Sequence, residues 1–114
     1  MDDNRIFVEA FGDPACPYDW SAEPARLRLR WRYGDALTWH HRMVGLSSTT
    51  EDYPARGITL ADLATSRVGI AQAYGMPIDA QIGTRHVATV VACRAVVAVR
   101  RMRPELVDAF LRHL

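Results

Sequence analysis

The chain has 114 residues, with 14 basic and 13 acidic side chains, a formal net charge of +1 and 49% hydrophobic residues. This length suffices for one small globular domain with a modest core. The small net charge gives no electrostatic basis for binding nucleic acid or an anionic membrane, so we expect neither partner. All 14 basic residues are arginines spread along the chain, which indicates solvated faces rather than one phosphate-binding cluster.

The N-terminal stretch MDDNRIFVEAF is acidic and is not typical of a signal peptide. No apolar run reaches the length of a membrane-spanning helix. The sequence therefore predicts a cytoplasmic protein. In that compartment Cys16 and Cys93 are expected to be reduced thiols rather than a structural disulfide.

The first half of the chain has the pattern of a strand, a helix and a second strand. The β-rich run 6–11 ends at Gly-Asp-Pro and predicts a strand, while 20–33 predicts a helix that stops at Gly34. Pro24, in or just after the first turn, is expected to bend this helix. The run 37–46 predicts a second strand. We expect three tryptophans to pack in the core, with one of them also suited to lining a groove: Trp20 (the groove candidate), Trp31 and Trp39.

The second half predicts helices. Residues 47–58 are polar and contain Pro and Gly, so we expect an exposed loop there. Thr59 and Asp62 form a capping box before a helix that ends at Gly75. Thr84 is expected to cap the next helix, and Pro104 to begin the last one. The apolar face expected for the helix after Thr84 consists of Val87, Val90, Val91, Ala95, Ala98 and Met102.

We therefore divide the chain into an N-terminal strand–helix–strand half, residues 1–47, and a helical half, residues 48–114. Two strands form a sheet that is only marginally stable alone. Either the remainder of a longer protein completes this sheet, or a second copy of the chain does so as a homodimer.

The histidines do not predict a metal site. His40 and His41 are adjacent, so on a strand they face opposite sides and cannot bind one metal ion together. His86 and His113 have no partner at ligand spacing. We expect no metal and no tightly bound cofactor.

Cys16 lies between the first strand and the following helix, in the stretch GDPACPYDW. A helix N-terminus offers unpaired N–H groups and the positive end of the helix dipole, which favour the nucleophilic thiolate. Pro17 suits the first helical position. Asp19, in the same turn, is expected to compete with a thiolate for those N–H groups. Spacing alone leaves Cys16 either a nucleophile or a small buried residue.

Several short motifs occur in a fixed order along nearly the whole chain. They are D-P-A-C-P-Y-D-W at 13–20, E-P at 23–24, Y-G-D at 33–35, M-V-G-L at 43–46, Y-G-M-P-I-D at 74–79 and A-C-R-A-V-V-A-V at 92–99. Together they resemble the cytosolic, dithiol-disulfide isomerase branch of the DsbA-like thioredoxin-fold oxidoreductases. The resemblance implies an α/β, thioredoxin-like fold with a helical insertion, and a redox position at Cys16.

The chain departs from that family's pattern at three points. Tyr18 replaces a common tryptophan, and Asp19 replaces the second cysteine of the dithiol members. The family's later strands, with their cis-proline loop, and its final helix have no counterpart here. Dithiol oxidation through positions 16 and 19 is therefore excluded, but Cys16 could still form a mixed disulfide that an external thiol resolves. Cys93, within an apolar run, is interpreted as a buried structural residue.

These features support three interpretations. The first is a thiol–disulfide oxidoreductase or isomerase that acts on a protein disulfide or a small thiol, with Cys16 as the catalytic residue. The second is a transferase or isomerase that uses glutathione or mycothiol, similar to kappa-class glutathione transferases and 2-hydroxychromene-2-carboxylate isomerase. The third is a non-catalytic binding module. The residues predicted to bind substrate or thiol are Pro17, Tyr18, Asp19 and Trp20.

Overall fold

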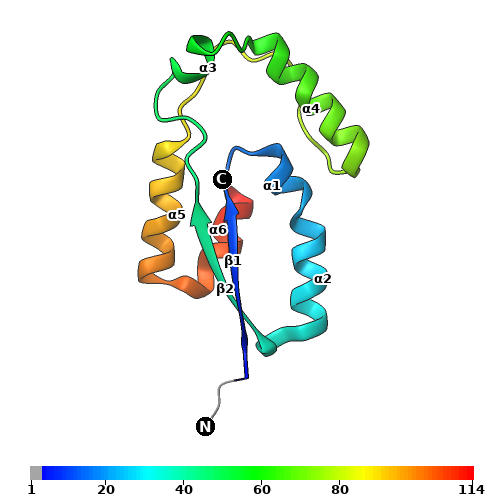
Figure 1. Ribbon diagram of the computed structural model, residues 1–114, viewed down its shortest axis with the longest axis vertical. Coiled ribbons are helices and arrows are strands. Elements are labelled where there is room, and N and C mark those ends of the chain that lie inside the picture. The colour runs from blue at the N-terminus through cyan, green and yellow to red at the C-terminus, as the bar shows by residue number, and fades with distance from the viewer. Residues whose placement is uncertain (1–3) are drawn as a thin grey trace.

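The computed structural model describes residues 4–114 as helices arranged around a two-stranded parallel sheet (Figure 1). Strand β1 (Ile6–Gly12) pairs with β2 (Leu37–Met43), in a register that runs from Ile6 opposite Leu37 to Gly12 opposite Met43. Both predicted strands are confirmed. The second ends at Met43 rather than at the predicted Leu46, because the backbone turns at Gly45, where φ is +66°.

The crossover between the strands contains two helices where the sequence predicted one. Helix α1 (Pro17–Ser21) and helix α2 (Glu23–Tyr33) meet at Ala22. Pro24 has no N–H to donate to the Trp20 carbonyl, so a continuous hydrogen-bond ladder is interrupted at this point. The predicted stop is confirmed, since Gly34 caps α2 and opens the short 3₁₀ helix η1 (Gly34–Ala36).

The segment predicted as an exposed loop contains a short helix, α3 (Asp52–Ala55). The Asp52 carboxylate accepts the backbone N–H groups of Ser48 at 2.6 Å and Thr49 at 3.2 Å, which organises the turn before this helix. Ser47 is 1% exposed. The prediction of an exposed loop is therefore wrong at 52–55, which form a helix, and at Ser47, which is buried.

Helix α4 (Leu60–Tyr74) has the predicted boundaries. Thr59 and Asp62 form the capping box, with the Asp62 N–H donating to the Thr59 hydroxyl at 3.1 Å. Gly75 ends the helix in the left-handed conformation, with φ of +77°. Residues with a side chain are strained in that conformation, which explains the glycine.

Helix α5 (Val90–Met102) begins later than predicted. Thr89, not Thr84, is its N-cap, and residues 75–89 form neither helix nor strand. The predicted apolar face is also wrong, because Val91 is 71% and Met102 78% exposed. The residues of α5 that are buried instead are Cys93 and Val96.

The chain ends in a 3₁₀ turn, η2 (Pro104–Leu106), followed by α6 (Val107–His113). Pro104 begins this turn rather than the α-helix itself. In Figure 1, α6 passes behind the two strands, and its Asp108 contacts His41 of β2. Helices α2, α5 and α6 thus surround one side of the sheet.

Few side chains of the described residues are fully buried. The radius of gyration is 15.9 Å, against about 13 Å for a compact domain of this length. Trp31 is 89% exposed, so its predicted place in the core is wrong. None of the described helices is long and apolar enough to cross a membrane. The buried hydrophobic residues are Ala64, Ile70, Cys93, Val96 and Val107.

Candidate active site

Cys16 lies at the start of α1, where the chain leaves β1. Its N–H donates to the Asp13 carbonyl oxygen at 2.9 Å, and its own carbonyl accepts the Trp20 N–H at 3.1 Å. Its backbone is extended, with φ of −83° and ψ of 117°, and Pro17 follows in the first turn. These constraints fix the position of a thiol that is partly exposed.

The carboxylate of Asp13 holds the loop before Cys16 in place. Its Oδ1 accepts the Ala15 N–H at 2.9 Å. Its Oδ2 accepts the Leu46 N–H at 2.8 Å and the Thr89 hydroxyl at 2.7 Å. Asp13 is only 1% exposed. This one side chain therefore joins the Cys16 loop to the segment after β2 and to the N-cap of α5.

Asp13 also binds the second cysteine. The Cys93 thiol donates to Asp13 Oδ2 at 3.3 Å. Burial, this hydrogen bond and the negative charge of Asp13 together raise the pKa of Cys93. Both cysteines are free, and Cys93 is 5% exposed. The prediction that Cys93 is a buried structural residue is confirmed, and its thiol is held in the neutral form.

The pKa of Asp13 reflects two opposing effects. Burial raises it, but the hydrogen bonds that the carboxylate accepts lower it by more than burial raises it. The pKa of Asp13 therefore lies below its usual value. Asp13 is therefore ionised at neutral pH. A buried charge of this kind needs every one of its hydrogen-bond partners.

A cavity of about 380 Å³ lies beside Cys16. Cys16, Pro17 and Tyr18 line one side of it, and residues of α4 such as Leu63 and Ile70 line another. In Figure 1, α4 and the segment that follows it arch over α1. Cavities of this size hold small-molecule ligands in many proteins. The thiol thus borders a space in which a small substrate fits.

Asp19 does not line this cavity. Its Oδ1 forms an ion pair with Arg26 at 2.8 Å, and Arg26 also donates to the Asp19 carbonyl at 3.0 Å. The carboxylate packs against Gly12, where an added Cβ would lie only 2.3 Å from Asp19 Oδ2. Asp19 therefore pairs with Arg26, whereas we expected it to compete with Cys16 for the N–H groups of α1.

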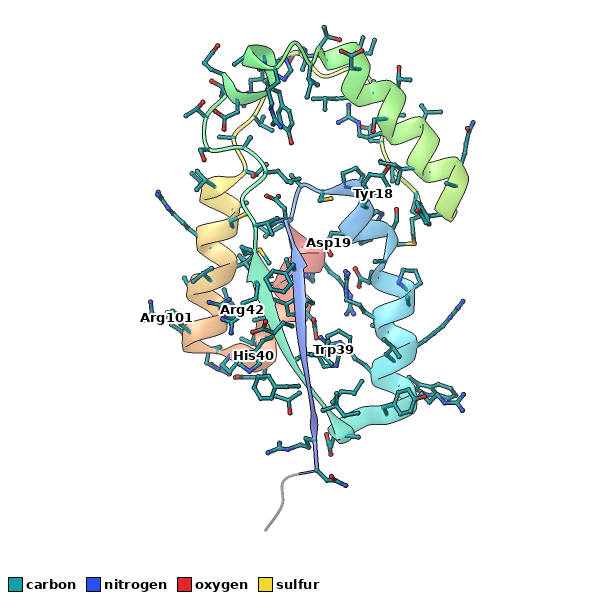
Figure 2. The ribbon with its side chains drawn as sticks, in the orientation of Figure 1. Tyr18, Asp19, Trp39, His40, Arg42 and Arg101 are labelled. Atoms are coloured by element: carbon teal, nitrogen blue, oxygen red, sulfur yellow. The ribbon has the colours of Figure 1, made fainter. Side chains whose placement is uncertain are left out.

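Trp20 and Tyr18 connect α1 to the chain around the end of α4. The Trp20 indole N–H donates to the Pro77 carbonyl at 3.0 Å, and Trp20 does not line the cavity. Tyr18, labelled with Asp19 in Figure 2, lines it and contacts Tyr74 edge-on, with ring centroids 6.1 Å apart. Pro17 and Tyr18 thus lie beside the thiol, and the binding roles of Pro17, Tyr18, Asp19 and Trp20 all stay predictions.

A second polar cluster lies on the helix-covered side of the sheet. Asp108 Oδ1 is 3.0 Å from His41 Nε2, and Asp108 Oδ2 is 2.8 Å from Arg30. A carboxylate only accepts hydrogen bonds, so Nε2 of His41 carries the proton. His40, in contrast, stacks on Phe7 at 4.7 Å on the opposite side of the sheet, and Figure 2 shows it pointing away from Trp39. The two histidines face opposite sides, as predicted.

The polar residues that support and surround Cys16 were not predicted from the sequence. The Asp-Pro dipeptide indicated a turn at Asp13, but the carboxylate binds Leu46 and Thr89, far away in the chain. The cavity lining also includes Arg67, Arg85 and His86, and no local spacing connects these residues to the Cys-Pro motif. Only the tertiary fold brings them to the thiol.

Comparisons with known proteins give one structural relative. No protein-family model matches the sequence, and no curated protein matches it. The fold is similar to a crystal structure described as a "putative protein disulfide isomerase from Nitrosomonas europaea", with a TM-score of 0.72 and 21% sequence identity. The match covers 94% of this chain and 52% of the relative, so the chain spans about half of that protein's length. This likeness supports the mixed α/β, thioredoxin-like fold that the motifs implied.

Proposed function

We propose that the chain carries out thiol–disulfide exchange through a single nucleophilic thiol, that of Cys16. The observation that carries the proposal is the partly exposed Cys16 side chain, fixed by backbone hydrogen bonds at the border of a cavity of about 380 Å³. The description of the structural relative as a disulfide isomerase agrees with this chemistry.

The arrangement of the other thiol determines the kind of exchange. The Cys93 thiol donates a hydrogen bond to Asp13 and is 5% exposed, so it is a poor candidate for resolving a disulfide at Cys16. We therefore propose a monothiol cycle. The Cys16 thiolate attacks one sulfur of a disulfide, the S–S bond breaks, and the leaving thiolate takes a proton from water. A second, external thiol then attacks the mixed disulfide and releases Cys16.

The chain is tested with a neutral small disulfide, hydroxyethyl disulfide. Intact mass spectrometry is expected to detect one adduct, mapped to Cys16 by peptide analysis and removed by added thiol. Cys16→Ser is expected to abolish the adduct. Cys93→Ser, whose hydroxyl can keep the hydrogen bond to Asp13, is the matched control and is expected to form the adduct normally.

Two results would overturn the proposal. One is an adduct on Cys93 instead of Cys16. The other is the absence of any adduct on folded protein, with the fold checked by circular dichroism. The second result would favour the non-catalytic binding module, since the proposed cycle begins with a mixed disulfide at Cys16.

A further inference from the structure

The cavity beside Cys16 has an unbalanced charge. Its lining includes Arg67, Arg85 and His86, and it includes no aspartate or glutamate. The whole chain, in contrast, has almost equal numbers of basic and acidic residues. No carboxylate among the lining residues therefore offsets the positive charges of Arg67 and Arg85.

The hydrogen bonds of these residues are incomplete. Arg67 donates to the Gln81 carbonyl at 3.0 Å, but its Nε is buried and has no partner. The ring of His86 stacks on that of Tyr53, with ring centroids 6.3 Å apart, and its Nδ1 is likewise buried without a partner. Arg85 is exposed and pairs with no carboxylate among the described residues. Leaving polar atoms unpaired is unfavourable, so a ligand that supplies acceptors would be stabilised here.

The rest of the lining is largely apolar. Leu46, Leu63, Ile70 and Val87 all border the same space as Cys16. A volume of about 380 Å³ accommodates a ligand of small-molecule size. The ligand that suits this lining is small, partly apolar and negatively charged, and it places a sulfur atom at the thiol.

We propose that the cavity formed by Cys16, Arg67, Arg85 and His86 binds low-molecular-weight thiols and disulfides that carry carboxylates. The arginines bind the carboxylates by charge-assisted hydrogen bonds, and the apolar residues contact the remainder of the ligand. The inference rests on the proposed exchange chemistry of Cys16, and it adds the class of substrate.

The reaction follows the two steps of the proposed monothiol cycle. Cys16 attacks one sulfur of the charged disulfide, forms a mixed disulfide with one half, and releases the other half as a thiolate that takes a proton from water. A second molecule of the same small thiol restores Cys16 and leaves as half of a new disulfide. The arginines stay in contact with the carboxylates throughout and exchange no protons.

The first experiment measures binding without reaction. S-methylglutathione carries two carboxylates and a blocked sulfur, so it reports on the cavity alone. Calorimetric titration is expected to show that Arg85→Gln and Arg67→Gln each weaken binding about fivefold or more. Arg101→Gln removes the same charge from the outer side of α5, where Figure 2 labels Arg101, and is expected to leave the affinity unchanged.

The second experiment compares rates of adduct formation at Cys16 for oxidised glutathione and for hydroxyethyl disulfide. The chain is expected to prefer the charged disulfide, and this ratio is expected to fall in Arg85→Gln but not in Arg101→Gln. Added salt should lower the ratio, since screening weakens charge attraction.

The two proposals fail in different ways. If Cys16 reacts with the neutral disulfide but shows no preference for oxidised glutathione, the charged-ligand inference is wrong and the exchange chemistry stands. If S-methylglutathione binds through the arginines but no disulfide reacts, the exchange chemistry is wrong. Equal losses of affinity in Arg85→Gln and Arg101→Gln would also overturn the inference, because the effect would then be one of net charge.

Discussion

Asp13 is the residue on which the geometry around Cys16 most directly depends. Its pKa is lowered in the fold, because the hydrogen bonds to its carboxylate outweigh the effect of burial. A carboxyl whose folded pKa lies below the unfolded value, about 3.9, stabilises the fold above that value. This stabilisation is lost as the pH falls through the folded pKa. The ionised form of Asp13 thus supports the fold at neutral pH.

We therefore predict that Asp13→Asn lowers the free energy of unfolding at pH 7 by about 1–3 kcal/mol. An amide N–H₂ cannot accept the Leu46 N–H that Oδ2 accepts at present. The difference from the unchanged chain should shrink at low pH, where Asp13 becomes protonated. Urea unfolding at several pH values measures both effects. Asp35→Asn, at an exposed position, is the control, and an equal loss in the two variants would contradict the prediction.

Single residues also show what local sequence can and cannot predict. The capping box of Thr59 and Asp62 was predictable, because both partners lie within one turn. Thr89 was missed as the N-cap of α5, because its hydroxyl donates to Asp13 and makes no local capping bond. Thr84, earlier in the chain, carries the same local N-cap signal, but its hydroxyl has no such distant partner among the described residues. A contact between distant segments decided this boundary.

At the scale of elements, one glycine lies within α4 and another directly follows it, and the two have opposite conformational requirements. Gly69 lies within the helix, and a Cβ there would meet no other atom within 4 Å. Gly75 ends the helix with φ of +77°. An alanine is favourable in the first conformation and strained in the second.

We predict that Gly69→Ala raises the free energy of unfolding by about 0.5–1 kcal/mol. Gly75→Ala is predicted to lower it by about 1 kcal/mol. The two variants add the same methyl group to one helix, so each serves as the control for the other in urea unfolding. A change of the same sign in both would mean that the helix end is not held as described.

The attachment of α6 depends on Asp108. The hydrogen bond from His41 is the main cause of the lowered pKa of Asp108, and the positive charge of Arg30 contributes against the opposing effect of burial. Arg112 of α6 also pairs with Glu23 of α2. These contacts connect the last helix to β2 and to α2.

We predict that Asp108→Ala loosens α6 from the sheet and leaves the half-buried Arg30 and the buried His41 without their acceptor. Amide hydrogen exchange in 107–113 should become at least about tenfold faster, as expected from the loss of roughly 1.5–3 kcal/mol. Glu105→Ala removes a carboxylate that, within residues 4–114, forms an ion pair with neighbouring Arg103 alone, and it serves as the control. Unchanged exchange in Asp108→Ala would show that apolar contacts alone hold α6.

At the scale of the whole molecule, elements were easier to predict than their contacts. The strands, α4 and the position of Cys16 at a strand–helix junction follow from periodicity, glycine and capping signals in adjacent residues. The cavity could not be predicted, since its walls combine the Cys16 loop with residues 83–89, which form no regular element. The division at residues 47 and 48 stays a prediction, although the Thr89 N–H donates to the Ser47 carbonyl at 2.9 Å at this boundary.

The side of the sheet that the helices leave open exposes aromatic side chains. Phe7 and Phe11 of β1 are 65% and 67% exposed there, and within the described residues the sheet has only two strands. Exposed aromatic groups beside an unpaired strand edge favour association between chains. We predict that the isolated chain self-associates at this face and that Phe11→Ser weakens association about tenfold, measured by sedimentation equilibrium. Met102→Ser, at a residue 78% exposed on α5, is expected to change it little. A chain that stays monomeric at all concentrations, or one that both variants affect equally, would refute a second copy as the partner of this sheet.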